Sequence, residues 1–132
     1  LASSAASDVY KRQEIDLTNQ RLVFYQKGTP IVDTPIVSGN PDIEGCGTPT
    51  GCYALDAKES PAVLTGEDYE ANVTYWMPFA GNVGIHDASW RSEFGGNLYL
   101  WEGSHGCVNV PYDKAAEIYA NIEVGMPVVV YE

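Results

Sequence analysis

A thiol and an imidazole lie two residues apart in the last third of the sequence. In the segment Gly103-Ser104-His105-Gly106-Cys107-Val108-Asn109, an extended backbone would place His105, Cys107 and Asn109 on one face. Gly106 removes a side chain beside the sulfur, which permits a turn and lets a substrate carbonyl approach closely. Because a thiolate is a good nucleophile, this spacing predicts acyl transfer to Cys107.

Activation of the thiol requires a base, and His86 is the other histidine of the chain. It ends the apolar segment Val83-Gly84-Ile85-His86 and is followed by Asp87. A nucleophile, a base and a group that orients the base are the parts of nucleophilic catalysis. A helix that starts near Pro111 would further favour the thiolate through its positive N-terminus. Singly, each histidine fits a hydrogen bond in a polar loop, but together with the thiol the two favour catalysis.

Short strands separated by turns are predicted along most of the chain. They cover residues 14–17, 21–26, 31–38, 52–55, 63–64, 72–78, 83–86, 98–101 and 126–131. One segment differs, because apolar side chains recur at helical spacing between Pro111 and Glu123. The pattern predicts a mainly β fold, a β-sandwich or a barrel-like sheet with one main α-helix after Cys107.

Composition limits the partners of the protein. A chain of 132 residues with 45% hydrophobic residues is sufficient for one domain. Its 18 acidic and 7 basic residues give a net charge of −11, which repels nucleic acid and anionic lipid surfaces. No apolar run approaches the roughly 20 residues of a membrane span, so no membrane insertion is expected within this chain.

The beginning of the chain is expected to lie outside the domain. The first seven residues are mostly small and polar, and Ser7 to Gln13 resembles one reading frame of a sequencing-library adaptor. We interpret residues 1–13 as a non-native or disordered leader and residues 14–132 as the domain, the alternative being an ordinary linker.

The two remaining cysteines are separated by a turn-rich stretch. Cys46 and Cys52 flank Gly47-Thr48-Pro49-Thr50-Gly51, which could bring them within bridging distance in an oxidising compartment. We predict a disulfide between them, with two free thiols as the alternative. Cys107 would then be the unpaired, reactive cysteine.

The whole pattern resembles the L,D-transpeptidase catalytic domain of bacterial cell walls. The resemblance includes His86 followed, after residues 87 to 103, by Ser-His-Gly-Cys-Val-Asn. It also includes the opening segment 14–22, the loop 48–51, the segment Tyr75-Trp76-Met77-Pro78-Phe79 and the segment Gly84-Ile85-His86-Asp87-Ala88. It covers residues 14 to 132 and implies a β-sandwich with mixed sheets.

The resemblance implies a role for each matching residue. Cys107 would be the acylated thiol, His86 its base and Asp87 the residue that orients this base. The signature residues Ser104, His105, Gly106 and Asn109 would support the site. Tyr75 is a candidate only because it lies in the strand before it, the alternative being an aromatic side chain packed in the sheet. No metal or cofactor is implied.

The implied substrates are peptidoglycan tetrapeptide stems, donor and acceptor, and the implied product is a 3-3 cross-link formed with release of D-alanine. If water resolves the thioester instead, the same site is an L,D-carboxypeptidase. Carbapenem β-lactams are implied covalent inhibitors, the expected location is extracytoplasmic, in the cell envelope or wall, and the expected state is a monomer.

Three other hypotheses remain at this point. A zinc site could use His86, Asp87, His105 and Cys107, although the histidines lack the short spacing of a zinc motif. A non-catalytic module that binds wall peptides would leave Cys107 buried and unreactive. A general cysteine peptidase would differ only in its substrate.

Overall fold

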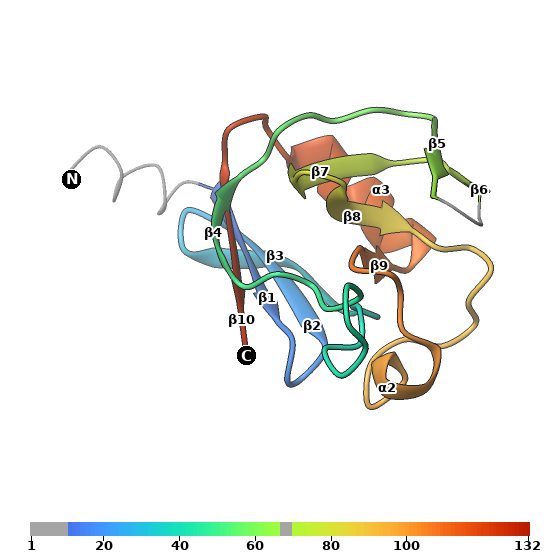
Figure 1. Ribbon diagram of the computed structural model, residues 1–132. Coiled ribbons are helices and arrows are strands. Elements are labelled where there is room, and N and C mark those ends of the chain that lie inside the picture. Colours follow the sequence, from blue (N-terminus) through green and yellow to red (C-terminus); the bar gives the residue numbers. More distant parts are fainter. Residues whose placement is uncertain (1–10, 67–69) are drawn as a thin grey trace.

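The computed structural model describes residues 11–66 and 70–132, which form three sheets and two helices (Figure 1). The largest sheet has the order β3-β2-β1-β10-β4. Its strands are β1 (Lys11–Asp16), β2 (Arg21–Gln26), β3 (Thr29–Pro35), β4 (Gly51–Ala54) and β10 (Pro127–Tyr131). The second sheet contains β7 (Trp76–Ala80), β8 (Val83–Asp87) and β9 (Val108–Val110), and the third is a hairpin of β5 (Ala62–Thr65) and β6 (Glu70–Val73). The helices are α2 (Tyr99–Glu102) and α3 (Tyr112–Asn121).

Tight turns explain the β1-β2-β3 meander. Lys27 and Gly28 connect β2 to β3 with φ angles of 53° and 76°, the positive values that a two-residue hairpin turn requires. At the other turn, the Asn19 backbone N–H donates to the Asp16 carboxylate at 3.0 Å. The buried Gln20 side chain then bonds Ser38, accepting from the Ser38 backbone N–H at 3.0 Å and donating to its hydroxyl at 2.9 Å. This turn therefore anchors the segment that leaves β3.

β1 lies between β2 and β10 at the centre of the largest sheet. It is antiparallel to β2 and parallel to β10, with Gln13 opposite Val128 and Ile15 opposite Val130. In Figure 1 the first and last strands lie side by side accordingly. The buried apolar side chains of these strands form one core with those of β7, β8, β9 and α3.

Helix α3 packs against β8 and β3 and closes this core. It begins directly after Pro111, whose fixed φ suits a helix start, and it buries Ala115 and Ile118. At its C-terminal end, the Lys58 ammonium donates to the backbone carbonyls of Tyr119 at 2.7 Å and Ile122 at 3.1 Å. A cation at this end complements the helix dipole, so residues of the β4–β5 connection fix the orientation of α3.

The predicted mainly β fold with mixed sheets and a main helix after Cys107 is confirmed, with four corrections to the elements. Residues 98–101 were predicted as a strand, but the helix α2 occupies most of them. Residues 72–78 form parts of two strands, because the chain turns at Thr74 and Tyr75 between β6 and β7. Residues 108–110, for which no strand was predicted, form β9.

The fourth correction concerns the start of the domain. β1 begins at Lys11, three residues before the predicted boundary, and the Gln13 side chain is fully buried. Lys11 also donates to the Asn121 carbonyl at 3.0 Å. The predicted leader therefore ends too late at residue 13, and its first ten residues lie outside the described part of the chain.

None of the helices in the described residues is long and apolar enough to cross a membrane.

Candidate active site

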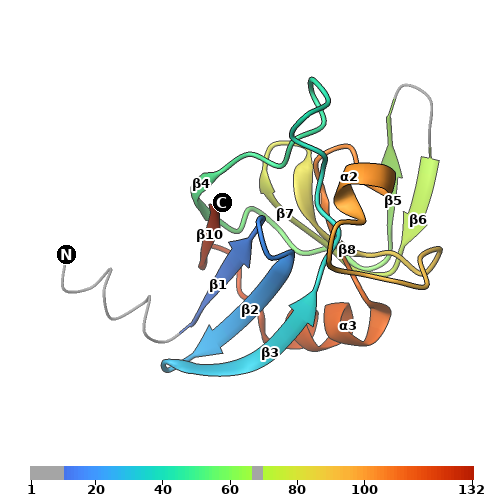
Figure 2. The ribbon, with the colours of Figure 1, turned by 90° about the horizontal axis from the view of Figure 1, so that it is seen from below.

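A pocket of about 640 Å³ opens between the second sheet, the β5–β6 hairpin and the segment before β9. The hairpin stands out from the rest of the molecule beside this pocket (Figure 2). The lining residues come from segments that are distant in sequence. They are Gly45, Val63, Leu64, Thr65, Ala71, Trp76, Asn82, Val83, His86, Trp90, Arg91, Gly103, Ser104, His105, Cys107 and Asn109.

The parallel pairing of β8 with β9 brings the predicted base and nucleophile to one wall of this pocket. His86 lies opposite Asn109 and Ile85 opposite Val108, so Cys107, one residue before β9, faces the start of β8. On the other side of β8, Gly84 allows the strand β7 to lie close, because a Cβ at Gly84 would lie 2.6 Å from the Cα of Pro78. The close approach of β7 to β8 therefore requires glycine at this position.

Cys107 rests as a protonated thiol. Its Sγ donates to the Asn82 backbone carbonyl at 3.5 Å. Burial raises the pKa of the Cys107 thiol above its ordinary value, and a hydrogen bond to the backbone of Gly84 opposes this effect only in part. The expectation that the helix after Pro111 would favour the thiolate is wrong, because the extended strand β9 separates Cys107 from the first turn of α3.

His86 is buried, with 4% of its surface exposed, and its ring lies near those of two tryptophans. The ring centroids of Trp76 and Trp90 are 6.0 Å and 5.9 Å from that of His86. Its Nδ1 lies 2.7 Å from the backbone carbonyl oxygen of Asp87. Since a carbonyl only accepts hydrogen bonds, Nδ1 carries the proton and Nε2 keeps its lone pair. Burial lowers the pKa of His86, so the imidazole is neutral at pH 7 and can accept a proton.

Asp87 contacts the base through its backbone and not through its side chain. The Asp87 carboxylate accepts the backbone N–H of Thr74 at 2.9 and 3.1 Å and that of Tyr75 at 2.7 Å. It therefore fixes the turn between β6 and β7, which leads into the strand that carries Trp76. The residue expected to orient His86 contacts it, but the group that does so is the carbonyl.

A set of hydrogen bonds holds the loop before Cys107. The Ser104 hydroxyl donates to the Cys107 carbonyl and accepts from the Gly106 backbone N–H at 3.2 Å. On the other side, the buried Thr48 hydroxyl donates to the Gly106 carbonyl at 2.6 Å and accepts from the Gly39 backbone N–H at 3.0 Å. Gly106 itself has a φ of 131°, which favours glycine. Ser104 and Gly106 are thus positioning residues for the backbone of the nucleophile.

The other two signature residues also line the pocket. The His105 side chain is exposed at its mouth, whereas Asn109 lies at its buried end with 2% of its surface exposed. The Asn109 backbone pairs with that of Val37 in both directions at 2.9 Å, and its side-chain Oδ1 has no partner among the described residues. His105, Cys107 and Asn109 therefore reach the same pocket as predicted, although the chain bends at residues 105 and 106 and is extended only from Val108.

The predicted Cys46–Cys52 disulfide is not formed, and all three cysteines are free. The Thr48 hydroxyl draws the loop of Cys46 toward Gly106, whereas Cys52 belongs to β4, opposite Val129. The short separation in sequence therefore does not correspond to proximity of the two thiols.

The residues proposed as zinc ligands do not converge. Within residues 11–66 and 70–132, no group of three or more His, Cys, Asp or Glu side chains could hold a metal ion. The Asp87 carboxylate bonds Thr74 and Tyr75, which removes it from the set.

Comparison with known proteins identifies the family. The profile of the L,D-transpeptidase catalytic domain (YkuD) matches residues 11–130. The chain belongs to the L,D-transpeptidase catalytic domain family. A comparison with curated proteins gives no match.

Several solved L,D-transpeptidase structures share the fold of this domain. A cysteine-to-serine mutant of the Enterococcus faecium L,D-transpeptidase is 40% identical, with a TM-score of 0.86 over 92% of this chain and 50% of that one. The Ldtfm-avibactam carbamoyl enzyme is 41% identical, with a TM-score of 0.87 over 95% of this chain and 49% of that one. The catalytic domain from E. faecium acylated by ertapenem is 41% identical, with a TM-score of 0.81 over 92% and 97%. This chain thus spans about half the length of the first two proteins.

Sequence reasoning placed Tyr75 at the site of this L,D-transpeptidase domain, but its ring lies elsewhere. Tyr75 packs against Tyr119 and Tyr112 of α3, with ring centroids 5.0 Å and 5.7 Å away. It does not line the pocket, whereas its neighbour Trp76 does. Tyr75 precedes the first residue of β7 and packs as an aromatic side chain against α3, which was the alternative interpretation.

Other lining residues were not predicted. Trp90 and Arg91 follow His86 closely in the sequence, and this proximity was the one available signal for them. Asn82 and the residues of the β5–β6 hairpin carry no sequence pattern that points to the pocket.

Proposed function

We propose that this domain forms 3-3 cross-links in peptidoglycan through a thioester on Cys107. The observation that carries the proposal is the pairing, in one pocket of a member of this family, of a protonated thiol with a neutral imidazole whose Nε2 has a free lone pair. With a neutral base in the same pocket, Cys107 need not be a thiolate before the reaction, because the thiol proton can pass to His86 while the sulfur attacks.

In the first half-reaction, His86 Nε2 accepts the thiol proton while Sγ attacks the carbonyl carbon of the third, diamino residue of a tetrapeptide stem. The bond from this carbon to the terminal D-alanine nitrogen breaks, and the imidazolium returns the proton to the leaving amine. The Asp87 carbonyl, 2.7 Å from Nδ1, stabilises the transient imidazolium and keeps the ring in place.

In the second half-reaction, the side-chain amine of an acceptor stem attacks the thioester carbon. The amine loses a proton to His86 Nε2, the carbon–sulfur bond breaks, and the sulfur takes the proton back. Acyl transfer to the amine gives the cross-link, and acyl transfer to water gives a shortened stem. Because the substrate is a wall polymer, the proposal includes an extracytoplasmic location.

Two proteins similar to this one are described as a carbamoyl enzyme with avibactam and a domain acylated by ertapenem. We extend this reactivity to Cys107 and expect carbapenems to acylate it.

Intact-mass spectrometry after incubation with a carbapenem, alongside Cys107→Ala and His86→Ala, tests the proposal. The unmodified protein should gain one stoichiometric adduct, Cys107→Ala none, and His86→Ala an adduct formed at least about 100-fold more slowly. Incubation with a disaccharide tetrapeptide should then release D-alanine and yield a dimer linked through two third residues. An unreactive thiol in folded protein would refute the catalytic role of Cys107, and a shortened stem without dimer would refute cross-linking in favour of hydrolysis.

A further inference from the structure

Arg91 enters the pocket through a turn that follows the base. The Arg91 backbone N–H donates to the Ala88 carbonyl at 3.1 Å, so the chain reverses direction immediately after β8. The same turn brings Trp90 against the ring of His86 and leaves Arg91 in the pocket wall. The guanidinium therefore shares one cavity with His86 and Cys107.

The Arg91 guanidinium lacks an acceptor. Its Nε is buried and has no hydrogen-bond partner among the described residues. No carboxylate in the described part of the chain forms an ion pair with Arg91. The charge of Glu102 on α2 influences the pKa of Arg91 electrostatically, but the two side chains do not form a salt bridge. A guanidinium has five N–H donors in a planar fork, and an unpaired donor that is withdrawn from water is unfavourable. The two Nη groups are not among the buried atoms without a partner, so a ligand can reach the guanidinium through them and supply an acceptor.

The charges around the pocket indicate which ligand. Arg91 is the one Lys or Arg among the described residues that line it, and no described Asp or Glu lines it. The chain as a whole carries −11. An anion is thus disfavoured over most of the molecule and attracted at this point. A carboxylate matches the planar fork with two parallel hydrogen bonds.

We propose that Arg91 binds the terminal carboxylate of the residue that leaves the donor stem, and so selects stems whose fourth residue is the last. This inference rests on the function proposed above. In the leaving residue, only the α-carbon separates the carboxylate carbon from the nitrogen of the breaking bond, so Cys107 cannot reach its target carbon without this carboxylate entering the same pocket. A longer or amidated stem presents no charge there. Arg91 acts on specificity and takes no part in the transfer of the acyl group.

Equilibrium binding in the Cys107→Ala background tests the proposal without chemistry. Two tetrapeptides are titrated, one with a free C-terminal carboxylate and one with a carboxamide, which differ only at the group in question. With Arg91 present, the free acid should bind about 10- to 100-fold more tightly than the amide, the range expected for a charge-assisted pair. In Cys107→Ala/Arg91→Gln the ratio should fall to about one, and Arg91→Lys should restore part of it, since a single ammonium keeps the charge without the fork.

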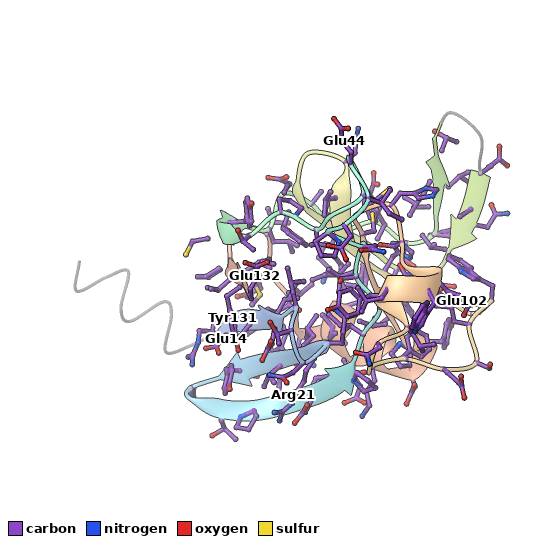
Figure 3. All side chains as sticks on the ribbon, turned by 60° about the horizontal axis from the view of Figure 1, so that its bottom comes forward. Glu14, Arg21, Glu44, Glu102, Tyr131 and Glu132 are labelled. Carbon is purple, nitrogen blue, oxygen red and sulfur yellow. The ribbon has the colours of Figure 1, made fainter. Side chains whose placement is uncertain are left out.

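Arg21→Gln is the matched control. It removes the same charge from the exposed sheet strand β2, where Arg21 pairs with Asp33, away from α2 and the β5–β6 hairpin (Figure 3). This variant should keep the full preference for the free acid. Thermal unfolding of each variant verifies that the domain is folded.

An unchanged acid-to-amide ratio in Arg91→Gln would overturn the proposal, as would an equal loss in Arg21→Gln. The proposal would also be overturned if Arg91 recognised an internal carboxylate of the stem instead of the terminal one. Peptides amidated only at that internal position identify this case, because they would then lose the Arg91-dependent binding. D-alanine release by the protein with Cys107 intact is measured separately. Absence of release with an Arg91-dependent binding ratio would refute the proposed function alone, and release with an unchanged ratio would refute only the role of Arg91.

Discussion

Replacement of Asp87 by asparagine separates the two ways in which this residue could serve His86. The carboxylate accepts two backbone N–H groups, from Thr74 and Tyr75, through three contacts of 2.7 to 3.1 Å. Asparagine keeps one acceptor oxygen but loses the charge and turns an amide N–H₂ toward Thr74. A hydrogen bond to a charged acceptor contributes about 1 kcal/mol more than a neutral one, and a buried donor facing a donor costs about 1 to 2 kcal/mol more. Asp87→Asn should therefore destabilise the domain by about 2 to 3 kcal/mol.

Catalysis should suffer much less, because the backbone carbonyl that contacts Nδ1 remains in place. Among folded molecules, we expect carbapenem acylation to slow by less than about tenfold, against the roughly 10⁴-fold loss that follows when an orienting carboxylate is replaced in a catalytic triad. Urea unfolding measures the stability, with a midpoint lowered by about 1 to 2 M for an ordinary denaturant slope. Acylation is then followed without urea, where the variant is folded. A rate loss of about 10³ or more with an unchanged urea midpoint would refute our assignment of the carbonyl as the orienting group.

Three further perturbations test other contacts. Thr48→Val leaves the Gly39 N–H and the Gly106 carbonyl unpaired and should lower the free energy of unfolding in urea by about 2 to 4 kcal/mol. Thr48→Ser keeps the hydroxyl and should lower it clearly less. Equal losses in the two variants would contradict the role of the Thr48 hydroxyl in joining Gly39 to Gly106. Because burial raises the pKa of the Cys107 thiol, less than about 3% should be thiolate at pH 7, and alkylation by iodoacetamide should still accelerate above pH 8.5; a plateau below pH 7 would indicate an ion pair instead. Gln13→Met should raise the stability by about 1 to 3 kcal/mol, because neither amide atom of the buried Gln13 has a partner within residues 11–66 and 70–132; a lower urea midpoint would disprove that reading.

The parts of the fold that the sequence predicts well are those with a long, regular pattern. The helix after Pro111 and the strand from Arg21 to Gln26 are confirmed because helical spacing and turn residues define them locally. The short apolar segment at residues 98–101 was predicted as a strand, but most of it is helical, and α2 buries none of its residues. Local pattern alone does not decide such a segment.

The candidate site was predictable where its residues share one segment or one known signature. Five of these residues line the pocket as expected, since β8, β9 and the loop before β9 carry them: His86, Ser104, His105, Cys107 and Asn109. Contacts made by backbone groups cannot be inferred from the residue types in the sequence, because every residue has a backbone carbonyl. The use of the Asp87 carbonyl and the turn that places Arg91 therefore emerge only from the three-dimensional structure. The same holds for the Thr48 hydrogen bonds to Gly39 and Gly106.

The central position of β1 beside β10 has a consequence for how this protein folds. Gln13 pairs with Val128, so the strand that completes the middle of the largest sheet is synthesised after the other four strands of that sheet. Contacts of such large separation in sequence form slowly, because the closure entropy of the whole intervening chain precedes any gain from the pairing. We expect a nascent chain that lacks residues 127–131 to expose the edges of β1 and β4 and to remain without a native core.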